Sequence, residues 1–294
     1  LSQFDMVISS SSFFSKGVIT RVGAVHISYC HTPTRKLWAE RPVAGEAGSL
    51  FSTPSAHMLR LWDANAAARV DYFIANSRHT KRAIGKYYRR DAFVVYPPVD
   101  ARALAYTRSL DEREQRLVDG LPENFYLVVS ALYPHKRVRL AVEAFSKLSY
   151  PLVIIGAGPQ QDHLERLAGE GTVLLGRQSD AVVAACYERC RALVHPAEDD
   201  FGIAPVEAMQ YGKPVVAYRK GGVTETVVDH VSGEFFDVAH PAVLADAVRR
   251  LEEGYDTLNP ALITAIGNRF GKDRFQEELR RVLKRILAHE MHAV

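Results

Sequence analysis

Two carboxylates with seven residues between them stand around a glycine-containing turn in residues 199–222. They are Asp199 and Glu207, and Gly202 lies between them. Glycine has no side chain to hold a ligand away from the backbone amides, and a helix start favours anionic groups. A carboxylate placed there can accept hydrogen bonds from the vicinal hydroxyls of a ribose. The pattern therefore favours a site that grips a sugar nucleotide.

The elements around these acids can be predicted from the same stretch. The apolar run 192–196 predicts a strand, and a helix should begin at the acidic cluster of Glu198, Asp199 and Asp200. Glu207 would then lie about two turns into this segment. A further strand is predicted within 213–218, with a second short helix after Gly222. For two acids taken alone, a helix cap and a solvated glutamate are the simpler explanation.

Three other segments of the second half carry groups suited to a nucleotide. Residues 128–136 read as a strand, a loop and the opening of a helix, which would place the Lys136 ammonium beside a diphosphate. Gly156 and Gly158 form a strand-to-helix turn that lets a ligand approach the backbone, or an ordinary tight turn. Arg177 could contact a base or merely cap a surface.

The first half supplies His31, which follows a predicted strand over 25–30 and precedes a proline-containing loop. The carboxyl ends of strands are where open α/β sheets bind ligands. A structural histidine with satisfied hydrogen bonds is an equally good explanation. Arg35 and Lys36 follow in the same loop.

Short apolar runs alternate with amphipathic patterns along nearly the whole chain, which predicts an α/β fold with parallel sheets covered by helices. The predicted strands are 6–9, 25–30, 72–75, 93–96, 126–130, 152–155, 173–175, 192–195 and 215–218, and the predicted helices include 77–90, 136–147, 181–189 and 242–253. Residues 97–100 break regular structure and the charged segment 107–116 follows, so we interpret this region as an interdomain linker.

Composition is typical of a globular protein, with 47% hydrophobic and 24% charged residues in a chain of 294 residues, long enough for two domains. Three cysteines, Cys30, Cys186 and Cys190, are too few for a disulfide framework and indicate reduced core thiols. No uninterrupted apolar segment has the length of a membrane span, and the first residues lack the pattern of a signal peptide. We expect a cytoplasmic protein.

Positive charge is concentrated in residues 1–100, which hold 13 Lys and Arg against 7 Asp and Glu, whereas the remainder holds 24 against 27. Such a basic half could attract an anionic membrane surface, here the inner membrane face, or a phosphate-bearing acceptor. A solvated helix face explains the charge equally well. Binding of nucleic acid is disfavoured because the few aromatic residues follow helical spacing.

Taken together, these segments resemble family 4 of the retaining glycosyltransferases. The resemblance rests on DDFGIAPVE from Asp199, SALYPHK to Lys136, YCHTP around His31, RVDYFIANS at 69–77 and YPPVD at 96–100. It extends over nearly the whole chain and is strongest for the mannosyltransferase-like subgroup of polysaccharide and O-antigen synthesis. It implies a GT-B fold with two Rossmann-like domains: residues 1–104, a reduced acceptor-side domain onto which the helix 272–294 packs back, and residues 117–271, which bind the nucleotide sugar.

The resemblance also implies residue roles. His31, Lys136 and Asp199 would form the catalytic set, with Lys136 at the diphosphate, Asp199 at the sugar hydroxyls and His31 at the sugar or the acceptor. The acceptor side would include Arg35 and Lys36. The donor would contact Glu207 through its ribose and, in addition, Gly202, Ile203, Ala204, Gly156, Gly158, Arg177 and Glu198. No metal and no cofactor are expected.

The chain departs from the family pattern at three places. Ala131 stands where the family has a phosphate-binding arginine, for which Arg137 or Arg139 could substitute. Asp199 stands where the family generally has glutamate, so Glu198 could compensate for the shorter side chain. The sequence starts near a strand inside the N-terminal domain, as a fragment or a naturally shortened member would, and residues 9–12, which end at Ser12, lie where relatives often carry a histidine. If that domain is naturally short, pairing between subunits in a homo-oligomer would cover its sheet edge.

Two functions follow from these observations. The first is a retaining transferase that moves a hexose from GDP-mannose or a UDP-sugar to an acceptor hydroxyl, including that of a lipid-linked saccharide. The second is a weakly active or inactive sugar-nucleotide-binding partner or regulatory protein, which Ala131, Asp199 and Ser12 favour.

Overall fold

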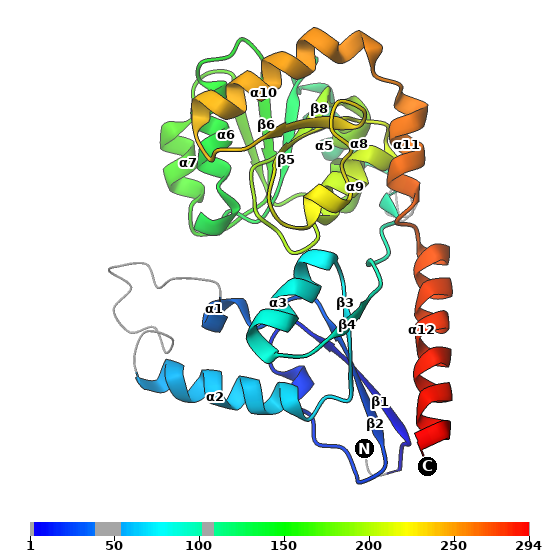
Figure 1. Cartoon of the computed structure of the whole chain (residues 1–294). Coiled ribbons are helices and arrows are strands. Elements are labelled where there is room, and N and C mark those ends of the chain that lie inside the picture. Colours follow the sequence, from blue (N-terminus) through cyan, green and yellow to red (C-terminus); the bar gives the residue numbers. More distant parts are fainter. Residues whose placement is uncertain (1–2, 39–53, 102–108, 294) are drawn as a thin grey trace. The chain divides into compact units, whose positions relative to one another are not determined.

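The computed structural model describes residues 3–38, 54–101 and 109–293. The chain divides into two compact units (Figure 1). Unit 1 comprises Leu1–Pro97 and Phe275–Val294, and unit 2 comprises Pro98–Arg274. Each is an α/β unit built on its own parallel sheet, as the alternating sequence pattern predicts.

Unit 1 contains a four-stranded sheet in the order β1-β2-β3-β4, with every neighbouring pair parallel. Its strands are β1 (Met6–Ser11), β2 (Val25–Cys30), β3 (Tyr72–Ala75) and β4 (Ala92–Val94). A short 3-10 turn η1 (Ser15–Gly17) follows β1, and the helices are α1 (Arg35–Trp38), α2 (Pro54–Ala68), α3 (Arg78–Tyr88) and α12 (Lys272–Ala293).

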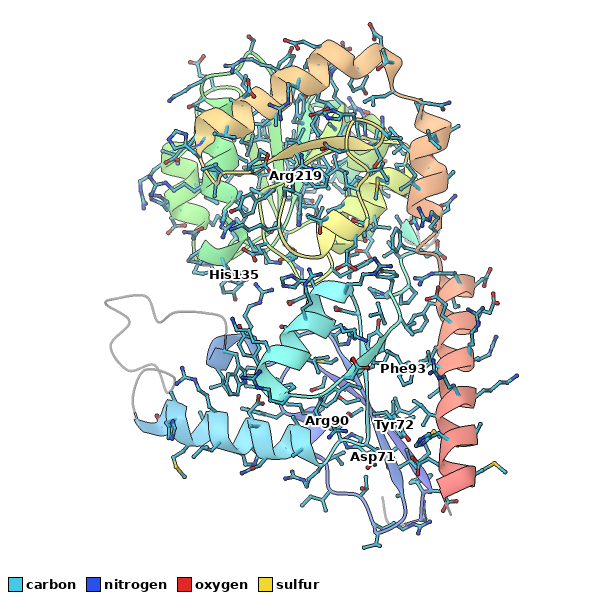
Figure 2. The ribbon with its side chains drawn as sticks, in the orientation of Figure 1. Asp71, Tyr72, Arg90, Phe93, His135 and Arg219 are labelled. Carbon is cyan, nitrogen blue, oxygen red and sulfur yellow. The ribbon has the colours of Figure 1, made fainter. Side chains whose placement is uncertain are left out.

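Both faces of this sheet are covered. On one face of the sheet, side chains that include Phe73 and Ala75 pack with Ala67, Ile84 and Tyr88 from α2 and α3. The opposite face buries Ile27, Tyr29 and Ile74 against Ile286 of α12, with Phe275, Leu279, Val282 and Leu283 packed around it. Figure 2 shows Tyr72 and Phe93 on the side of the sheet that faces α12, where the Tyr72 hydroxyl hydrogen-bonds His289 at 2.9 Å and Arg285 lies over the Phe93 ring. The C-terminal helix is thus an integral layer of unit 1.

Unit 2 contains a six-stranded parallel sheet in the order β10-β9-β8-β5-β6-β7. The strands are β5 (Tyr126–Val129), β6 (Leu152–Ile155), β7 (Thr172–Gly176), β8 (Ala192–His195), β9 (Val215–Tyr218) and β10 (Gly233–Phe236). The first three strands along the chain extend to one side and the next three extend to the other. The order therefore reverses between β5 and β8, which makes this pair the switch point where doubly wound sheets bind ligands.

Helices cover both faces of the unit 2 sheet. α6 (Val138–Phe145), α7 (Gln161–Leu167) and α10 (Pro241–Gly254) bury apolar side chains against one face. The other helices are α5 (Glu112–Asp119), α8 (Asp180–Arg189), α9 (Ile203–Gln210) and α11 (Pro260–Asn268), and α8 and α9 contact β5 and β8. Short 3-10 turns complete the unit: η2 (Pro134–Lys136), η3 (Gly221–Glu225) and η4 (Tyr255–Thr257).

The predicted linker is wrong in its second part. Residues 112–119 form the helix α5, whose N-cap Asp111 accepts hydrogen bonds from the amides of Arg113 and Glu114 while the Glu114 side chain returns to the Asp111 amide. This capping box makes a charged segment helical. Residues 102–108 of the predicted linker lie outside the described residues. The unit boundary falls at Pro97, against the predicted 104, and the first three residues of α12 are grouped with unit 2.

Candidate functional site

The loops that follow β5 and β8 meet at the switch point of unit 2. Lys136 ends the η2 turn after β5, and Asp199 follows β8. The Lys136 Nζ lies 2.7 Å from Asp199 Oδ1, and both side chains remain partly exposed, at 24% and 18%. A charged pair thus stands at the carboxyl edge of the two strands where an open α/β sheet offers its ligand crevice. These two predicted residues are brought together although 63 positions separate them.

The sequence pattern predicts Lys136 at the start of a helix, and this prediction is wrong. It closes the η2 turn, and α6 begins two residues later at Val138 after Arg137, which adopts φ 54°. The η2 turn and the contact with Asp199 therefore position the Lys136 ammonium, and Lys136 does not lie in the first turn of α6.

Asp199 is not a helix cap. The N-cap of α9 is Gly202, at φ 88°, and it makes no side-chain capping hydrogen bond. Instead, the loop that carries Asp199 packs on the η3 turn, where the Gly222 amide donates to the Asp199 carbonyl at 2.8 Å. The simpler explanation of the acid as an N-cap is thus excluded for Asp199.

Gly222 supports the loop of Asp199 by close backbone approach. A Cβ at this position would lie 2.4 Å from both the Asp200 carbonyl oxygen and the Phe201 Cα. We expect Gly222→Ala to push the loop aside and to lower the free energy of unfolding by about 1–3 kcal/mol, as overpacking does. Urea unfolding would measure this loss. Gly169→Ala is the matched control, because a Cβ there meets nothing within 4 Å; equal stability of the two variants would contradict the assigned packing role.

Glu207 lies in the second turn of α9 and is half-buried. The Tyr187 hydroxyl of α8 donates to its Oε2 at 2.8 Å, and the ring of Tyr187 stacks on Tyr211. Burial raises the pKa of the Glu207 carboxyl, and the hydrogen bond from Tyr187 opposes that rise. Glu207 is therefore a carboxylate that its neighbour orients, not a freely solvated helix residue.

The glycine turn after β6 has a structural explanation. A Cβ on Gly156, at φ 143°, would lie 1.8 Å from the Ser130 carbonyl oxygen, and one on Gly158 would lie 2.7 Å from that of Leu132. These glycines allow the loop after β6 to pack against the loop after β5. The tight-turn alternative accounts for both residues, and the loop they support is the one that leads to Lys136.

The two arginines that could replace the family arginine at Ala131 differ in placement. Arg139 points outward, where it pairs with Glu143 one turn along α6 at 2.6 Å. Arg137 points toward the sheet edge: its guanidinium lies 4.7 Å from the Tyr218 ring centroid and 3.7 Å from Glu198, and its Nη1 is buried without a hydrogen-bond partner among the described residues. Of these two arginines, Arg137 is the one whose side chain faces the sheet edge.

The remaining residues predicted to contact the donor lie at the start of α9 and just after the edge strand β7. Gly202 is buried, Ala204 is half-buried and Ile203 is 52% exposed. Arg177 is exposed just after β7, at the far edge of the sheet from β10.

The acceptor-side predictions lie in unit 1. His31 follows β2 and its Nε2 shares a hydrogen bond with the Ser10 hydroxyl at 2.8 Å, while its ring packs edge-on against Tyr29. Arg35 opens α1 and is half-buried. The side chain of Lys36 lies outside the described part of the structure.

Two polar side chains near the donor residues escaped the sequence analysis. One is Tyr187 of α8, whose hydroxyl donates to Glu207, 20 positions away. The other is His195, the last residue of β8, whose side chain is 7% exposed. A histidine that ends an otherwise apolar strand was the available signal. Because its neighbours all favour burial, the pattern predicts His195 only as the end of the strand.

A group of ligand-type atoms occurs elsewhere in unit 2. Within the described residues, Asp229, His230 and Glu234 place one such atom each within 4.8 Å of one another. Arg219, labelled in Figure 2, pairs with Asp229 at 2.7 Å, and Arg250 pairs with Glu234 at 3.3 Å. Because guanidinium groups already compensate both carboxylates, this cluster is a salt-bridge network.

Residues 111–263, more than half of the chain, match the family model described as glycosyl transferases group 1. The chain belongs to this family. The match begins at the α5 capping residue and includes the Lys136, Asp199 and Glu207 segments. Unit 2 is therefore the part that carries the family's defining sequence.

Individual relatives agree with this family. The chain is 28% identical over 204 residues to the alpha-1,3/1,6-mannosyltransferase ALG2 of Candida glabrata, covering 54% of this chain and 44% of that protein. It spans about half the length of the curated relatives it matches.

Solved structures show the same fold. A sucrose-phosphate synthase from Thermosynechococcus elongatus superposes with a TM-score of 0.72 at 14% identity, covering 97% of this chain and 74% of the other. HepE of Anabaena, in complex with UDP-glucose, gives 0.68 at 22% identity, with 88% and 72% covered. The prediction of a GT-B fold with two Rossmann-like units is confirmed.

No helix in residues 3–38, 54–101 or 109–293 combines the length and the apolar character needed to cross a bilayer.

Proposed function

We propose that this glycosyl transferase group 1 chain is a retaining glycosyltransferase that moves a hexose from a nucleotide diphosphate sugar to an acceptor hydroxyl. One observation carries the proposal. The Lys136–Asp199 pair lies at 2.7 Å at the switch point between β5 and β8, the place where doubly wound sheets bind nucleotides. A paired ammonium and carboxylate are suited to a ligand that presents both phosphate oxygens and hydroxyl groups.

Each unit 2 side chain has a role in this proposal. Lys136 neutralises the diphosphate, Asp199 accepts from sugar hydroxyls, and Glu207 accepts from the ribose. In the transfer step, the bond between the anomeric carbon and the diphosphate oxygen breaks while the acceptor oxygen bonds to the same face of that carbon. The acceptor proton passes to the departing diphosphate. Lys136 stabilises the charge that develops on the leaving group, which is the electrostatic work that the step requires.

Mannose is our first proposal for the sugar, with GDP-mannose as donor, because the relative from Candida glabrata is named as a mannosyltransferase. UDP-sugars are the alternative, which the HepE complex with UDP-glucose supports. For the acceptor side we propose His31 and Arg35, with a saccharide or a lipid-linked saccharide as acceptor. The basic character of residues 1–100 suits contact with an anionic membrane surface.

A second candidate function rests on Ala131, which lacks the guanidinium that the family resemblance implies. Without it, the chain would bind a sugar nucleotide and transfer the sugar slowly or not at all. Arg137, whose Nη1 is buried without a partner among the described residues, favours the enzyme because it offers a replacement guanidinium at the same loop.

Ala131→Arg separates the two functions. Ala131 is exposed at the carboxyl end of β5, so an arginine can be accommodated there. For a weakened enzyme we expect transfer or donor hydrolysis to rise about tenfold or more, the usual contribution of a charge-assisted contact to phosphate. Donor hydrolysis by the purified variant measures this. Donor binding without turnover in both forms would instead support the binding protein, and Ser130→Arg serves as a control for added charge nearby.

A further inference from the structure

His195 is a buried polar side chain without a hydrogen bond at its outer nitrogen. It ends β8, its side chain is 7% exposed, and Nε2 has no partner within the described ranges of the chain. Leaving a buried polar atom unpaired is unfavourable, and such atoms in native proteins call for a specific explanation. The sequence of β8 offers none, because an apolar residue would fill the same place without this cost.

The His195 imidazole points toward the candidate donor site. Alternation along β8 places it on the same face as Leu193, and α9 contacts this strand. Its Nε2 lies 3.6 Å from Asp199 Oδ2, just beyond hydrogen-bond distance. The other carboxylate oxygen of Asp199 is held by Lys136 at 2.7 Å. Asp199 therefore lies between Lys136, which is within hydrogen-bond distance, and His195, which is not.

The charge state of the imidazole suits a donor of this kind. Burial lowers the pKa of His195, Asp199 opposes that shift and Lys136 adds to it. The ring is thus neutral near pH 7 and carries one proton. An ionised carboxylate can only accept, so a neutral ring that faces Asp199 is best placed with its proton on Nε2.

We propose that His195 is a positioning residue that takes over Asp199 when Lys136 moves to the diphosphate of a bound donor. The inference rests on the proposed function and adds a residue to it. When the Lys136 ammonium turns to the phosphate, its 2.7 Å contact with Asp199 is lost. Asp199 then loses the hydrogen bond from Lys136, and an approach of less than 1 Å by His195 Nε2 would supply another on the opposite oxygen. The oxygen that Lys136 releases, Oδ1, then faces the sugar hydroxyl.

His195→Gln and His195→Leu form a matched pair for the test, because the side chains are similar in size and only the glutamine amide can donate near the position of Nε2. Titration calorimetry measures the affinity for GDP-mannose and UDP-glucose relative to GDP and UDP. We expect His195→Leu to lose about tenfold or more of the extra affinity that the sugar confers, while affinity for the diphosphates stays within about threefold. His195→Gln should retain most of that extra affinity. An unchanged ratio in His195→Leu, or equal losses in both variants, would overturn the proposal.

A ligand-free measurement keeps this inference separate from the proposed function. In Lys136→Met the competing ammonium is gone, so His195 Nε2–H should bond to Asp199. We expect its NMR signal, assigned by its absence in Lys136→Met/His195→Gln, to move downfield from its position in the unsubstituted protein. An unmoved signal would overturn the role of His195 whatever nucleotides the chain binds. Absence of nucleotide binding together with a moved signal would count against the proposed function alone.

Discussion

Asp63→Leu is expected to lower the free energy of unfolding of unit 1 by about 3–5 kcal/mol, the usual result of removing one partner of a buried ion pair. Asp63 and Lys16 are both fully buried, at 0% and 2% side-chain exposure, with 2.6 Å between Oδ1 and Nζ. Without the carboxylate, the Lys16 ammonium would keep, within the described residues, the Phe13 carbonyl and the Thr34 hydroxyl as acceptors.

Asp63 also accepts from three other donors that unit 1 brings together. They are the Thr34 hydroxyl, the Trp38 indole and the Tyr88 hydroxyl, each at 2.8 Å. These donors lie in the loop after β2, in α1 and in α3, whereas Asp63 itself belongs to α2. One carboxylate thereby joins four segments, among them the loop that begins at His31. Loss of Asp63 should destabilise unit 1 as a whole.

Tryptophan fluorescence during urea unfolding measures this effect selectively, because the chain has two tryptophans, Trp38 and Trp62, and both lie in unit 1. A double-mutant cycle with Lys16→Met supplies the control. Lys16→Met should cost less than Asp63→Leu, because the remaining carboxylate keeps three donors. The double variant should be more stable than the sum of the single losses predicts by at least about 1 kcal/mol, as coupled neighbours are. Additive losses would contradict the assigned pairing.

Glu207→Ala is expected to weaken nucleotide binding on the order of a hundredfold. In the proposed contact, two ribose hydroxyls donate hydrogen bonds to the ionised Glu207 carboxylate, each contributing about 1.5 kcal/mol or more. A free-energy change of about 1.4 kcal/mol corresponds to a tenfold change in affinity. Alanine removes both. Calorimetric titration with the nucleoside diphosphate measures the loss, and an unchanged affinity would make the donor-site assignment wrong.

Glu207→Gln and Tyr187→Phe separate the charge from the geometry. Glutamine keeps an acceptor for the Tyr187 hydroxyl but removes the negative charge, so its loss should be smaller than that of alanine. Because burial raises the pKa of Glu207 and the Tyr187 hydrogen bond lowers it, removing that hydroxyl should raise the pKa further. As the pH is lowered, nucleotide affinity should therefore begin to fall at a higher pH in Tyr187→Phe than in the unsubstituted protein. Superimposable pH profiles would contradict this orientation of the carboxylate.

Much of the fold could be predicted because short apolar runs in a parallel sheet are buried on both faces. The strands 72–75, 152–155 and 215–218 occur as β3, β6 and β9 with the predicted bounds. β10 was missed because its four residues include Glu234, a charged side chain that becomes buried through Arg250 and His230. That compensation depends on α10, which no local pattern reveals.

The candidate site shows the same division between local and long-range information. Asp199, Glu207 and Lys136 were recognisable because their residue types and local spacing suit a nucleotide sugar. The contact between Lys136 and Asp199 depends on β5 lying beside β8, and the local sequence of neither segment predicts that strand order. The same holds for Tyr187 beneath Glu207. His195 shows the limit most clearly, since only packing reveals that its Nε2 is buried without a partner among the described residues.

Calorimetric titration of the purified chain with GDP-mannose, UDP-glucose, UDP-N-acetylglucosamine and the parent nucleotides tests the central claim most directly. We predict saturable binding of at least one sugar nucleotide, tighter than that of its diphosphate because Asp199 adds contacts to the sugar. Slow hydrolysis of the same compound, followed in parallel, would identify the donor. Absence of binding for every nucleotide and sugar nucleotide, by a chain that is folded, would contradict a donor site at the switch point of unit 2.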